Sequence, residues 1–245
     1  MVVIEPMDHF ACVATGRECW HGNQNLPRHR HSQAYLAVVL SGGYEECGSR
    51  GRLRAGPGDV LVHNTFDAHL DRFQKNGAQV LNLVVAGPVP RFAMGFVGDP
   101  EAIARTAGHD PIEAQLHLRE QLREAKQPAE DWPDLLARDL LDNPECRLGD
   151  WARRHGLTPE TVSRGFGKVF GVTPAYYRSE VRVRRAFALI VESEMPLVRV
   201  AATSGFADQA HLSRATRALT GSPPSAWRKS NPFKTSGENQ PNVRR

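Results

Sequence analysis

A stretch in the C-terminal half of the chain returns fifty positions later. Residues 162–178 read VSRGFGKVFGVTPAYYR, and residues 212–228 read LSRATRALTGSPPSAWR. The shift superimposes a Ser-Arg pair, a glycine, a proline and a final pair of an aromatic residue and an arginine. Self-similarity at a fixed period indicates one supersecondary unit used twice. This half of the chain is therefore expected to contain two copies of one small fold.

The first copy has the pattern of two helices separated by a glycine turn. Residues 147–156, RLGDWARRHG, carry apolar residues at helical spacing and end at Gly156. Thr158 is then placed to cap a second helix, with Pro159 in its first turn, and Gly171 follows that helix as a stop signal. A helix, a turn and a second helix make a helix-turn-helix motif.

The second copy repeats the same signals. PLVRVAATSG stops at Gly205, Asp208 is the expected cap, and QAHLSRATRAL runs to Gly221. Residues 174–193, between the copies, have the length and amphipathic pattern of a connecting helix. A single helix pair would suit an ordinary helical bundle, but two copies with a small polar residue beside an arginine at matching places favour nucleic-acid binding.

The charge of the chain is divided unevenly. Residues 145–245 hold 17 Lys or Arg and 8 Asp or Glu, a net charge of +9, whereas residues 1–144 have a net charge of −5. A basic half joined to an acidic half suggests that one half meets a polyanion while the other has a different role. Uneven solubilising charge is the alternative, and charge alone does not decide between them.

Over residues 133–229 the chain resembles the AraC/XylS family of transcription regulators. LGDWARRHGLTPETVSRGFGKVFGVTPAYYR and LVRVAATSGFADQAHLSRATRALTGSPPSAWR carry this resemblance. It implies contacts to base edges of DNA from both second helices, namely from Glu160, Ser163 and Arg164 in the first copy and from Gln209, His211, Ser213 and Arg214 in the second. The sequence departs from the family at Leu212 and Thr216, where phenylalanine is usual, so the second copy is expected to pack less tightly.

The N-terminal half has the pattern of a β structure. AYLAVVLSGGYEE, RLRAGPGDVLVHN and AQVLNLVVAG alternate strand-forming residues with Gly and Pro turns. A compact antiparallel barrel or jelly roll is expected. The fold class is therefore α+β, with a β-barrel followed by an all-α part holding two helix-turn-helix units.

PRHRH, residues 27–31, opens the candidate ligand site. On one continuous strand His29, His31, Gln33 and Tyr35 would share a face, because side chains two residues apart point the same way. Together with the Pro-Gly-Asp turn at residues 57–59 and His69 downstream, this part resembles a cupin domain, the effector domain commonly found in AraC/XylS proteins.

The role of the three histidines is left open by the residues. His29, His31 and His69 are the candidate ligands of a divalent metal ion as a cofactor. Together with Gln33 and Tyr35 they are equally candidates for contacts to an organic effector, and the third alternative is a structural role. Many metal-binding cupins have a glutamate where this chain has Tyr35, which argues against redox iron chemistry. The position of His63 relative to this site is not fixed by sequence.

Four parts are predicted. Residues 1–98 form the cupin-like effector domain, residues 99–132 a helical linker, residues 133–229 the DNA-binding domain and residues 230–245 a disordered tail. Leucines in the linker suit either pairing with a second copy of the chain or ordinary packing.

The resulting hypothesis is a cytoplasmic transcription regulator that binds promoter DNA and responds to a small effector or metal ion. A homodimer is expected, with RNA polymerase as a further candidate partner and no membrane association, because no apolar run has the length of a membrane span. Four cysteines without a CxxC pair do not form the pattern of a disulfide framework. The alternative hypothesis is a metal-dependent cupin enzyme, an isomerase or dioxygenase, with a helical appendage. That alternative explains the histidines but not the repeat.

Overall fold

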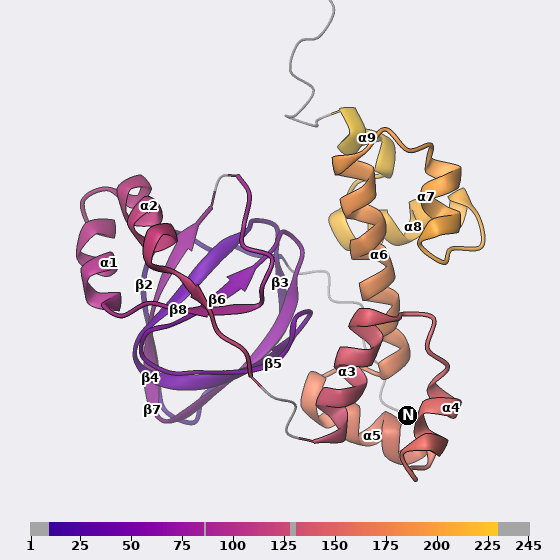
Figure 1. Ribbon diagram of the computed structural model, residues 1–245, viewed down its shortest axis with the longest axis horizontal. Helices are drawn as coiled ribbons and strands as arrows, with labels where there is room; N and C mark the ends of the chain where they lie inside the picture. The colour runs from indigo at the N-terminus through magenta and orange to yellow at the C-terminus, as the bar shows by residue number, and fades with distance from the viewer. Residues whose placement is uncertain (1–9, 86, 128–130, 230–245) are drawn as a thin grey trace, which may run out of the picture. The chain divides into compact units, whose positions relative to one another are not determined.

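The computed structural model describes residues 10–85, 87–127 and 131–229. The chain divides into two compact units, Met1–Val181 and Arg182–Arg245. The first unit contains a β-rich part, residues 10–127, called the β domain below, together with the first helix-turn-helix copy. The second copy lies in the second unit. The α+β class predicted from the sequence is confirmed (Figure 1).

The described strands of the β domain belong to one nine-stranded sheet. Its strands are β1 (Phe10–Ala11), β2 (Gly16–Trp20), β3 (Asn25–His31), β4 (Tyr35–Gly48), β5 (Gly51–Ala55), β6 (Asp59–His63), β7 (Ala68–Val84), β8 (Met94–Phe96) and β9 (Arg123–Glu124). The hydrogen-bonded order is β1-β3-β7-β4-β6-β8-β9, with β2 on β7 and β5 on β4. The long strands β4 and β7 pair antiparallel and curve together, so the sheet has a barrel-like shape (Figure 1). Its relation to cupins stays a prediction.

The two faces of this sheet bury different apolar clusters. Leu36 and Val38 of β4 pack in one cluster, together with residues of two helices. Tyr35, Ala37 and Val39 of the same strand pack in another cluster, on the opposite face. This division follows from the two-residue period of a strand. It leaves one face for the core and the other for a ligand site.

Two helices follow the sheet in the predicted linker. α1 (Pro100–Ala107) is capped by Asp99, and α2 (Pro111–Gln121) is capped by Asp110, each with proline in the first turn. Leu118 of α2 is fully buried in the cluster with Leu36 and Val38. Leu116, in contrast, is 59% exposed. Packing within the β domain therefore accounts for Leu118, whereas pairing of two chains through this helix stays a prediction.

The first helix-turn-helix copy follows the pattern that the sequence indicated. Its helices are α3 (Trp132–Asp142), α4 (Leu148–Arg154), α5 (Pro159–Phe170) and the start of α6 (Pro174–Glu192). The backbone N–H of Thr161 donates a 3.2 Å hydrogen bond to the Thr158 hydroxyl, which confirms the predicted cap. Gly171 ends α5 with φ = 70°, a left-handed conformation that a residue with a side chain rarely adopts.

The second copy has the same design. It consists of α7 (Leu197–Thr203), α8 (Gln209–Thr220) and α9 (Pro224–Lys229). The backbone N–H of His211 donates to the Asp208 carboxylate at 2.6 Å, which confirms that cap. Gly221 ends α8 with φ = 77°, close to the value at Gly171. The fifty-residue repeat is thus a structural repeat. The predicted disordered tail, residues 230–245, lies outside the described residues.

Within the first unit, the first copy packs against the β domain. Cys47 of β4 and Leu70 of β7 belong to the same buried cluster as Trp151 and Phe166. The hydroxyl of Tyr177 donates to the carbonyl of Gly48 at 3.2 Å. The sheet therefore helps to form the core of this copy.

An ion-pair network reinforces this contact. Glu180 of α6 accepts hydrogen bonds from Arg28 at 2.6 Å and from Arg30 at 2.5 Å, and all three side chains are at most 7% exposed. Both arginines lie on β3. Removing one partner from such a buried group is costly, because the remaining charges are left without compensation.

Two further observations concern the whole described chain. None of its helices combines the length and the apolar character needed to cross a membrane. Its cysteines, Cys12, Cys19, Cys47 and Cys146, are free thiols, which agrees with the absence of a disulfide pattern in the sequence.

Candidate functional site

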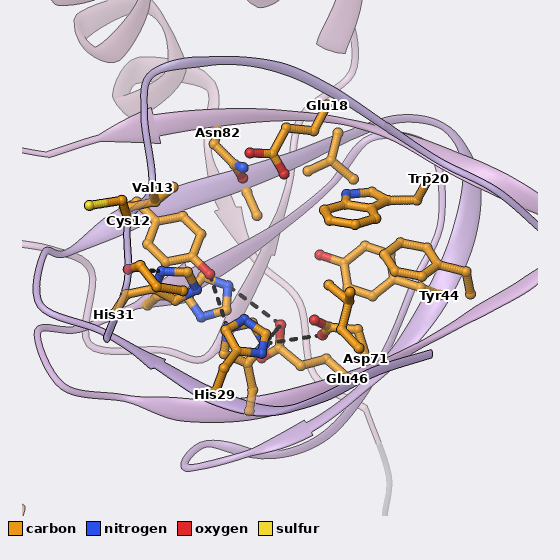
Figure 2. A pocket seen from close by; sticks show the side chains of 18 of the residues that line it. Cys12, Val13, Glu18, Trp20, His29, His31, Tyr44, Glu46, Asp71 and Asn82 are labelled. Carbon is orange, nitrogen blue, oxygen red and sulfur yellow. Dashed lines mark hydrogen bonds and ion pairs between the residues drawn. The ribbon is translucent and has the colours of Figure 1, made fainter. Parts of the chain in front are cut away.

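A cavity of about 310 Å³ opens in the β domain on the sheet face that carries Tyr35 and Ala37. One part of its wall is apolar and aromatic, and there Trp20 and Phe73 stack with ring centroids 5.2 Å apart. The other part carries imidazoles and acids, namely His29, His31, His63, His69, Glu46 and Asp71. His29 and His31 lie on one side of the pocket, and Trp20 and Tyr44 lie on the other (Figure 2). The pocket is therefore amphipathic.

β3 places its histidines in this pocket because its side chains alternate between two faces. His29 and His31 line the cavity. Arg28 and Arg30, which alternate with these histidines, reach Glu180 of α6 instead. One seven-residue strand thus contacts both the pocket and the first helix-turn-helix copy.

Gln33 does not join this site, contrary to the sequence-based expectation. The strand predicted through residues 29–39 is interrupted, because β3 ends at His31 and β4 begins at Tyr35. Gln33 lies in the bend between them and is exposed. Tyr35 still enters the pocket, as the first residue of the next strand.

The backbone fixes which nitrogens of the outer histidines are available. Nδ1 of His29 lies 2.9 Å from the carbonyl of Pro27, and Nδ1 of His31 lies 3.0 Å from the carbonyl of Ala11. A carbonyl only accepts, so both rings donate from Nδ1 and keep an unprotonated Nε2 when neutral. Each of His29, His31 and His69 offers one ligand atom, and these atoms lie within 4.8 Å of one another. An imidazole whose second nitrogen is held in this way is the usual form of a metal ligand, so this group fits a divalent ion.

His69 lies between two kinds of neighbour. Its Nδ1 is 3.0 Å from the Asp71 carboxylate and 3.4 Å from Glu46, and its Nε2 is 3.1 Å from the Tyr35 hydroxyl. His69 is 5% exposed. The strand register explains the cluster, because Glu46 pairs with Asp71 between β4 and β7, and Tyr35 pairs with His63 between β4 and β6.

Burial and charge shift the pKa values of these groups in opposite directions. Burial lowers the pKa of His31 to about 4, and it also lowers the pKa of His29. For His69, burial opposes protonation, but the carboxylates of Asp71 and Glu46 outweigh it and raise the pKa to about 9. Near neutral pH the two outer histidines are therefore neutral, which is the ligating form, while His69 is a cation paired with Asp71. Burial raises the pKa of the neighbouring Glu46 to about 8.

Sequence reasoning missed Glu46 because the two-residue period of β4 is broken. It also left the position of His63, on β6, undetermined. Counting by twos from Tyr35 puts odd-numbered residues on the pocket face. The register shifts between Val39 and Ser41 and again between Gly42 and Tyr44, and beyond these bulges Tyr44 and Glu46 line the cavity. A single extra residue reverses the alternation, and the net effect of this irregular stretch is one such reversal. The Gly42-Gly43 pair is the only sequence signal that marked the irregularity.

The candidate DNA contacts of the first copy lie on α5. Glu160, Ser163 and Arg164 are all exposed, within the first two turns after the Thr158 cap. Their neighbours Val162 and Phe166 are buried on the opposite side of the helix. The helix therefore presents the predicted residues along one open edge.

The second copy places its candidate contacts in the same way. Gln209, His211 and Arg214 are exposed on α8, and Ser213 is half-buried. The His211 ring packs edge-on against Phe206, with centroids 5.1 Å apart. Arg164 and Arg214, fifty residues apart, thus have equivalent and exposed positions on their helices.

Comparison with known proteins gives the class of this C-terminal part. Residues 151–230 match the family model described as a helix-turn-helix domain. The chain is 34% identical over 84 residues to the HTH-type transcriptional regulator ExsA of Pseudomonas aeruginosa, a match that covers 34% of this chain and 30% of that protein. It is 32% identical over 90 residues to the arabinose operon regulatory protein of Escherichia coli, covering 37% of this chain and 31% of that protein. Residues 151–230 are thus a helix-turn-helix domain, and their similarity to these regulators confirms the resemblance to the AraC/XylS family seen in the sequence. The matches span about a third of these relatives.

Solved structures give likenesses of lower similarity. ToxT from Vibrio cholerae with a bound unsaturated fatty acid covers 91% of this chain and 97% of its own, at 8% identity and a TM-score of 0.43. The DNA-binding domain of AdpA in complex with a target DNA covers 41% of this chain and 92% of its own, at 24% identity and a TM-score of 0.38. Both scores lie below 0.5, and the fold assignment rests on the geometry described above.

Proposed function

We propose that this protein is a DNA-binding transcription regulator with two helix-turn-helix copies that contact promoter DNA and a β domain that binds an effector. The observation that carries the proposal is the presence of two equivalent helices with exposed arginines, Arg164 and Arg214, in a domain of the AraC/XylS type. An arginine at such a place can donate two hydrogen bonds to a guanine in the major groove. The net charge of +9 over residues 145–245 favours the approach to phosphates.

The pocket of the β domain supports the effector half of the proposal. Its volume of about 310 Å³ suits a small molecule, and its lining pairs an aromatic wall with hydrogen-bonding imidazoles. His29, His31 and His69 also fit a divalent ion, which would supply a positive centre able to hold an anionic group of an effector. Tyr35 is placed beside His69 to line such a site.

β3 offers a physical route from the pocket to the first DNA-binding copy. A ligand held by His29 and His31 acts on a strand whose other face holds Glu180 through Arg28 and Arg30. Glu180 lies on α6, the helix that follows α5. An effector regulates DNA binding only if it has different affinities for two arrangements of the protein, and this strand is where such a difference would arise.

The enzyme alternative is not favoured. The relatives that match the C-terminal part are named as regulators. A cupin enzyme would use the pocket but would leave the two exposed arginine edges without a role. A homodimer and contact with RNA polymerase stay predictions of the resemblance.

The DNA half is tested by fluorescence anisotropy with the DNA upstream of the protein's own gene. The full chain is expected to bind this duplex more tightly than an unrelated duplex of equal length, and the preference should disappear in the Arg164→Ala, Arg214→Ala double variant. The Lys168→Ala, Arg217→Ala double variant is the matched control, because both side chains are exposed near the ends of α5 and α8 and their replacement removes an equal charge. Equal binding of both duplexes by the unmodified protein would refute sequence-specific regulation.

The effector half is tested with the same duplex. Addition of a divalent metal such as Zn²⁺ to EDTA-treated protein is expected to change the affinity for DNA, and His31→Ala should abolish that change while keeping the basal affinity. If metal ions leave DNA binding unchanged, the three histidines are left as contacts to an organic effector or as structural residues.

A further inference from the structure

A second group of possible metal ligands lies at the inner end of the pocket. It consists of Glu46 from β4, His63 from β6 and His69 from β7, with exposed fractions of 3%, 2% and 5%. Their ligand atoms lie within 4.8 Å of one another. Two of the three, Glu46 and His63, are absent from the outer group of His29, His31 and His69.

Two atoms of this inner group have no hydrogen-bond partner. They are Oε2 of Glu46 and Nε2 of His63, and both are fully buried. They face each other at 3.5 Å without forming a hydrogen bond, and Oε2 is also 3.4 Å from Nδ1 of His69. Buried polar atoms are nearly always satisfied, because water is no longer available to them. Nδ1 of His69 is hydrogen-bonded to Asp71, so the two unpartnered atoms, Oε2 of Glu46 and Nε2 of His63, are the ones that indicate a missing partner.

The separations suit a metal ion better than direct hydrogen bonds. Zinc binds imidazole nitrogen and carboxylate oxygen at about 2.1 Å, so two ligands of a tetrahedral site lie about 3.4 Å apart. The observed 3.4 Å and 3.5 Å agree with that distance. A direct hydrogen bond between charged groups would be shorter, at about 2.8 Å. An ion would therefore fit with little movement of these side chains.

The chemistry of the group also indicates the class of ion. Two imidazoles and one carboxylate form a mixed donor set that favours first-row transition metals over Mg²⁺ or Ca²⁺, which prefer oxygen ligands. Asp71 lies 3.0 Å from Nδ1 of His69. Binding through Nδ1 requires this nitrogen to release its proton to solvent, and the hydrogen bond to Asp71 is then lost.

We propose that Glu46, His63 and the Nδ1 side of His69 form an inner binding site for a divalent transition-metal ion such as Zn²⁺. An imidazole has two nitrogens, so the same ring leaves Nε2 for the outer histidines and Tyr35. The inference deepens the proposed function by adding a second ligand position to the pocket, and it rests on that proposal only for the role of the pocket. It is tested without DNA, so either proposal can fail alone.

The test is calorimetric titration of the EDTA-treated full chain with Zn²⁺, using Glu46→Gln, His63→Gln and the outer-group variant His31→Ala. Glu46→Gln keeps the shape of the side chain and removes its charge. Both inner variants are expected to lose one equivalent of Zn²⁺ or to weaken its binding by more than about 100-fold, beyond the usual effect of losing an outer-sphere partner. His31→Ala should retain the inner ion.

Unchanged Zn²⁺ binding in folded Glu46→Gln and His63→Gln would overturn the inner site. Loss of all Zn²⁺ binding in His31→Ala would also overturn it, because the ion would then belong to the outer histidines. A crystal of the unmodified protein soaked with Zn²⁺ decides the case if the variants do not fold. An anomalous peak between Glu46 and His63 supports the site, and its absence at saturating Zn²⁺ refutes it.

Discussion

The two helix-turn-helix copies share their turns but not their interiors. Glycine ends the second helix of both with nearly equal φ values, 70° at Gly171 and 77° at Gly221, and a side chain caps the start of each. At equivalent interior positions, however, Phe166 of the first copy corresponds to Thr216 of the second. Both residues are completely buried. The repeat therefore preserves the path of the chain and the exposed arginines while its core changes.

The change in the core has a hydrogen-bonding explanation. In the first copy Phe166 and Phe170 stack on each other and contact Tyr177. In the second copy the corresponding partner is Trp227, whose indole N–H donates to the hydroxyl of Thr220 at 2.8 Å. A half-buried tryptophan needs such an acceptor. Thr220 stands where the first copy has Phe170, and it supplies the hydrogen-bond acceptor that Trp227 needs.

The change from Phe166 in the first copy to Thr216 in the second has no such hydrogen-bonding explanation. Its hydroxyl is buried without a hydrogen-bond partner, and so is the hydroxyl of Ser204 in the same copy. Leaving a buried hydroxyl unsatisfied costs about 1–3 kcal/mol. The looser packing predicted for the second copy from Leu212 and Thr216 stays a prediction, because both side chains are completely buried and what Thr216 shows is an unsatisfied hydroxyl.

The largest effect is expected from Phe166→Ala. Removal of this completely buried ring should lower the free energy of unfolding of the first unit by about 4 kcal/mol, because a cavity remains in the core. Thr216→Ala, the equivalent change in the second copy, should cost less than about 1 kcal/mol because only small groups are removed. Urea unfolding followed by circular dichroism measures both changes, and equal losses would contradict the difference between the two cores.

The next effect concerns the ion pairs between the first copy and the β domain. Glu180→Gln leaves Arg28 and Arg30 buried without a countercharge and should destabilise the first unit by about 3 kcal/mol. Glu192→Gln, at an exposed position on the same helix, is the control and should be nearly neutral. Thermal unfolding detects the difference. A neutral Glu180→Gln would mean that the network adds no stability.

The two copies can also be compared by their DNA contacts. Arg164→Ala and Arg214→Ala are each expected to weaken specific binding by roughly 2 kcal/mol, if each arginine contacts one guanine bidentately. The loss should be confined to one or two operator positions, and these positions should differ between the two variants. Anisotropy titrations over a set of single-base operator variants measure this. A uniform loss at all sequences would identify phosphate contacts instead.

The smallest expected effect is an increase in the stability of the second unit. Thr216→Val replaces the unsatisfied hydroxyl with a methyl group of similar size and should stabilise the second unit by about 1 kcal/mol. Thr220→Val provides the contrast, because it removes the acceptor of the Trp227 indole and should destabilise the same unit. Urea midpoints of the two variants are expected to move in opposite directions, and a loss of stability in Thr216→Val would show that the hydroxyl has a partner in solution.

The sequence was most informative where local rules act. Thr158, Asp208, Gly171 and Gly221 were identifiable because caps and left-handed turns depend on a few neighbouring residues. It failed for Gln33 because a strand break carries no periodic signal. Glu46 was missed because the irregular pairing of β4 with β7 between Val39 and Tyr44 reverses the alternation before it. Long-range pairing therefore limited the prediction of the site more than that of the helices.

The alternation of arginine and histidine along β3 restricts how this segment can vary in length. Insertion or deletion of a single residue between Arg28 and His31 would exchange the two faces there, so that an arginine would enter the cavity and a histidine would meet Glu180. A change of two residues would keep the faces. A library designed to alter ligand preference should therefore vary positions 29 and 31 and keep the length of the segment from Arg28 to His31 constant.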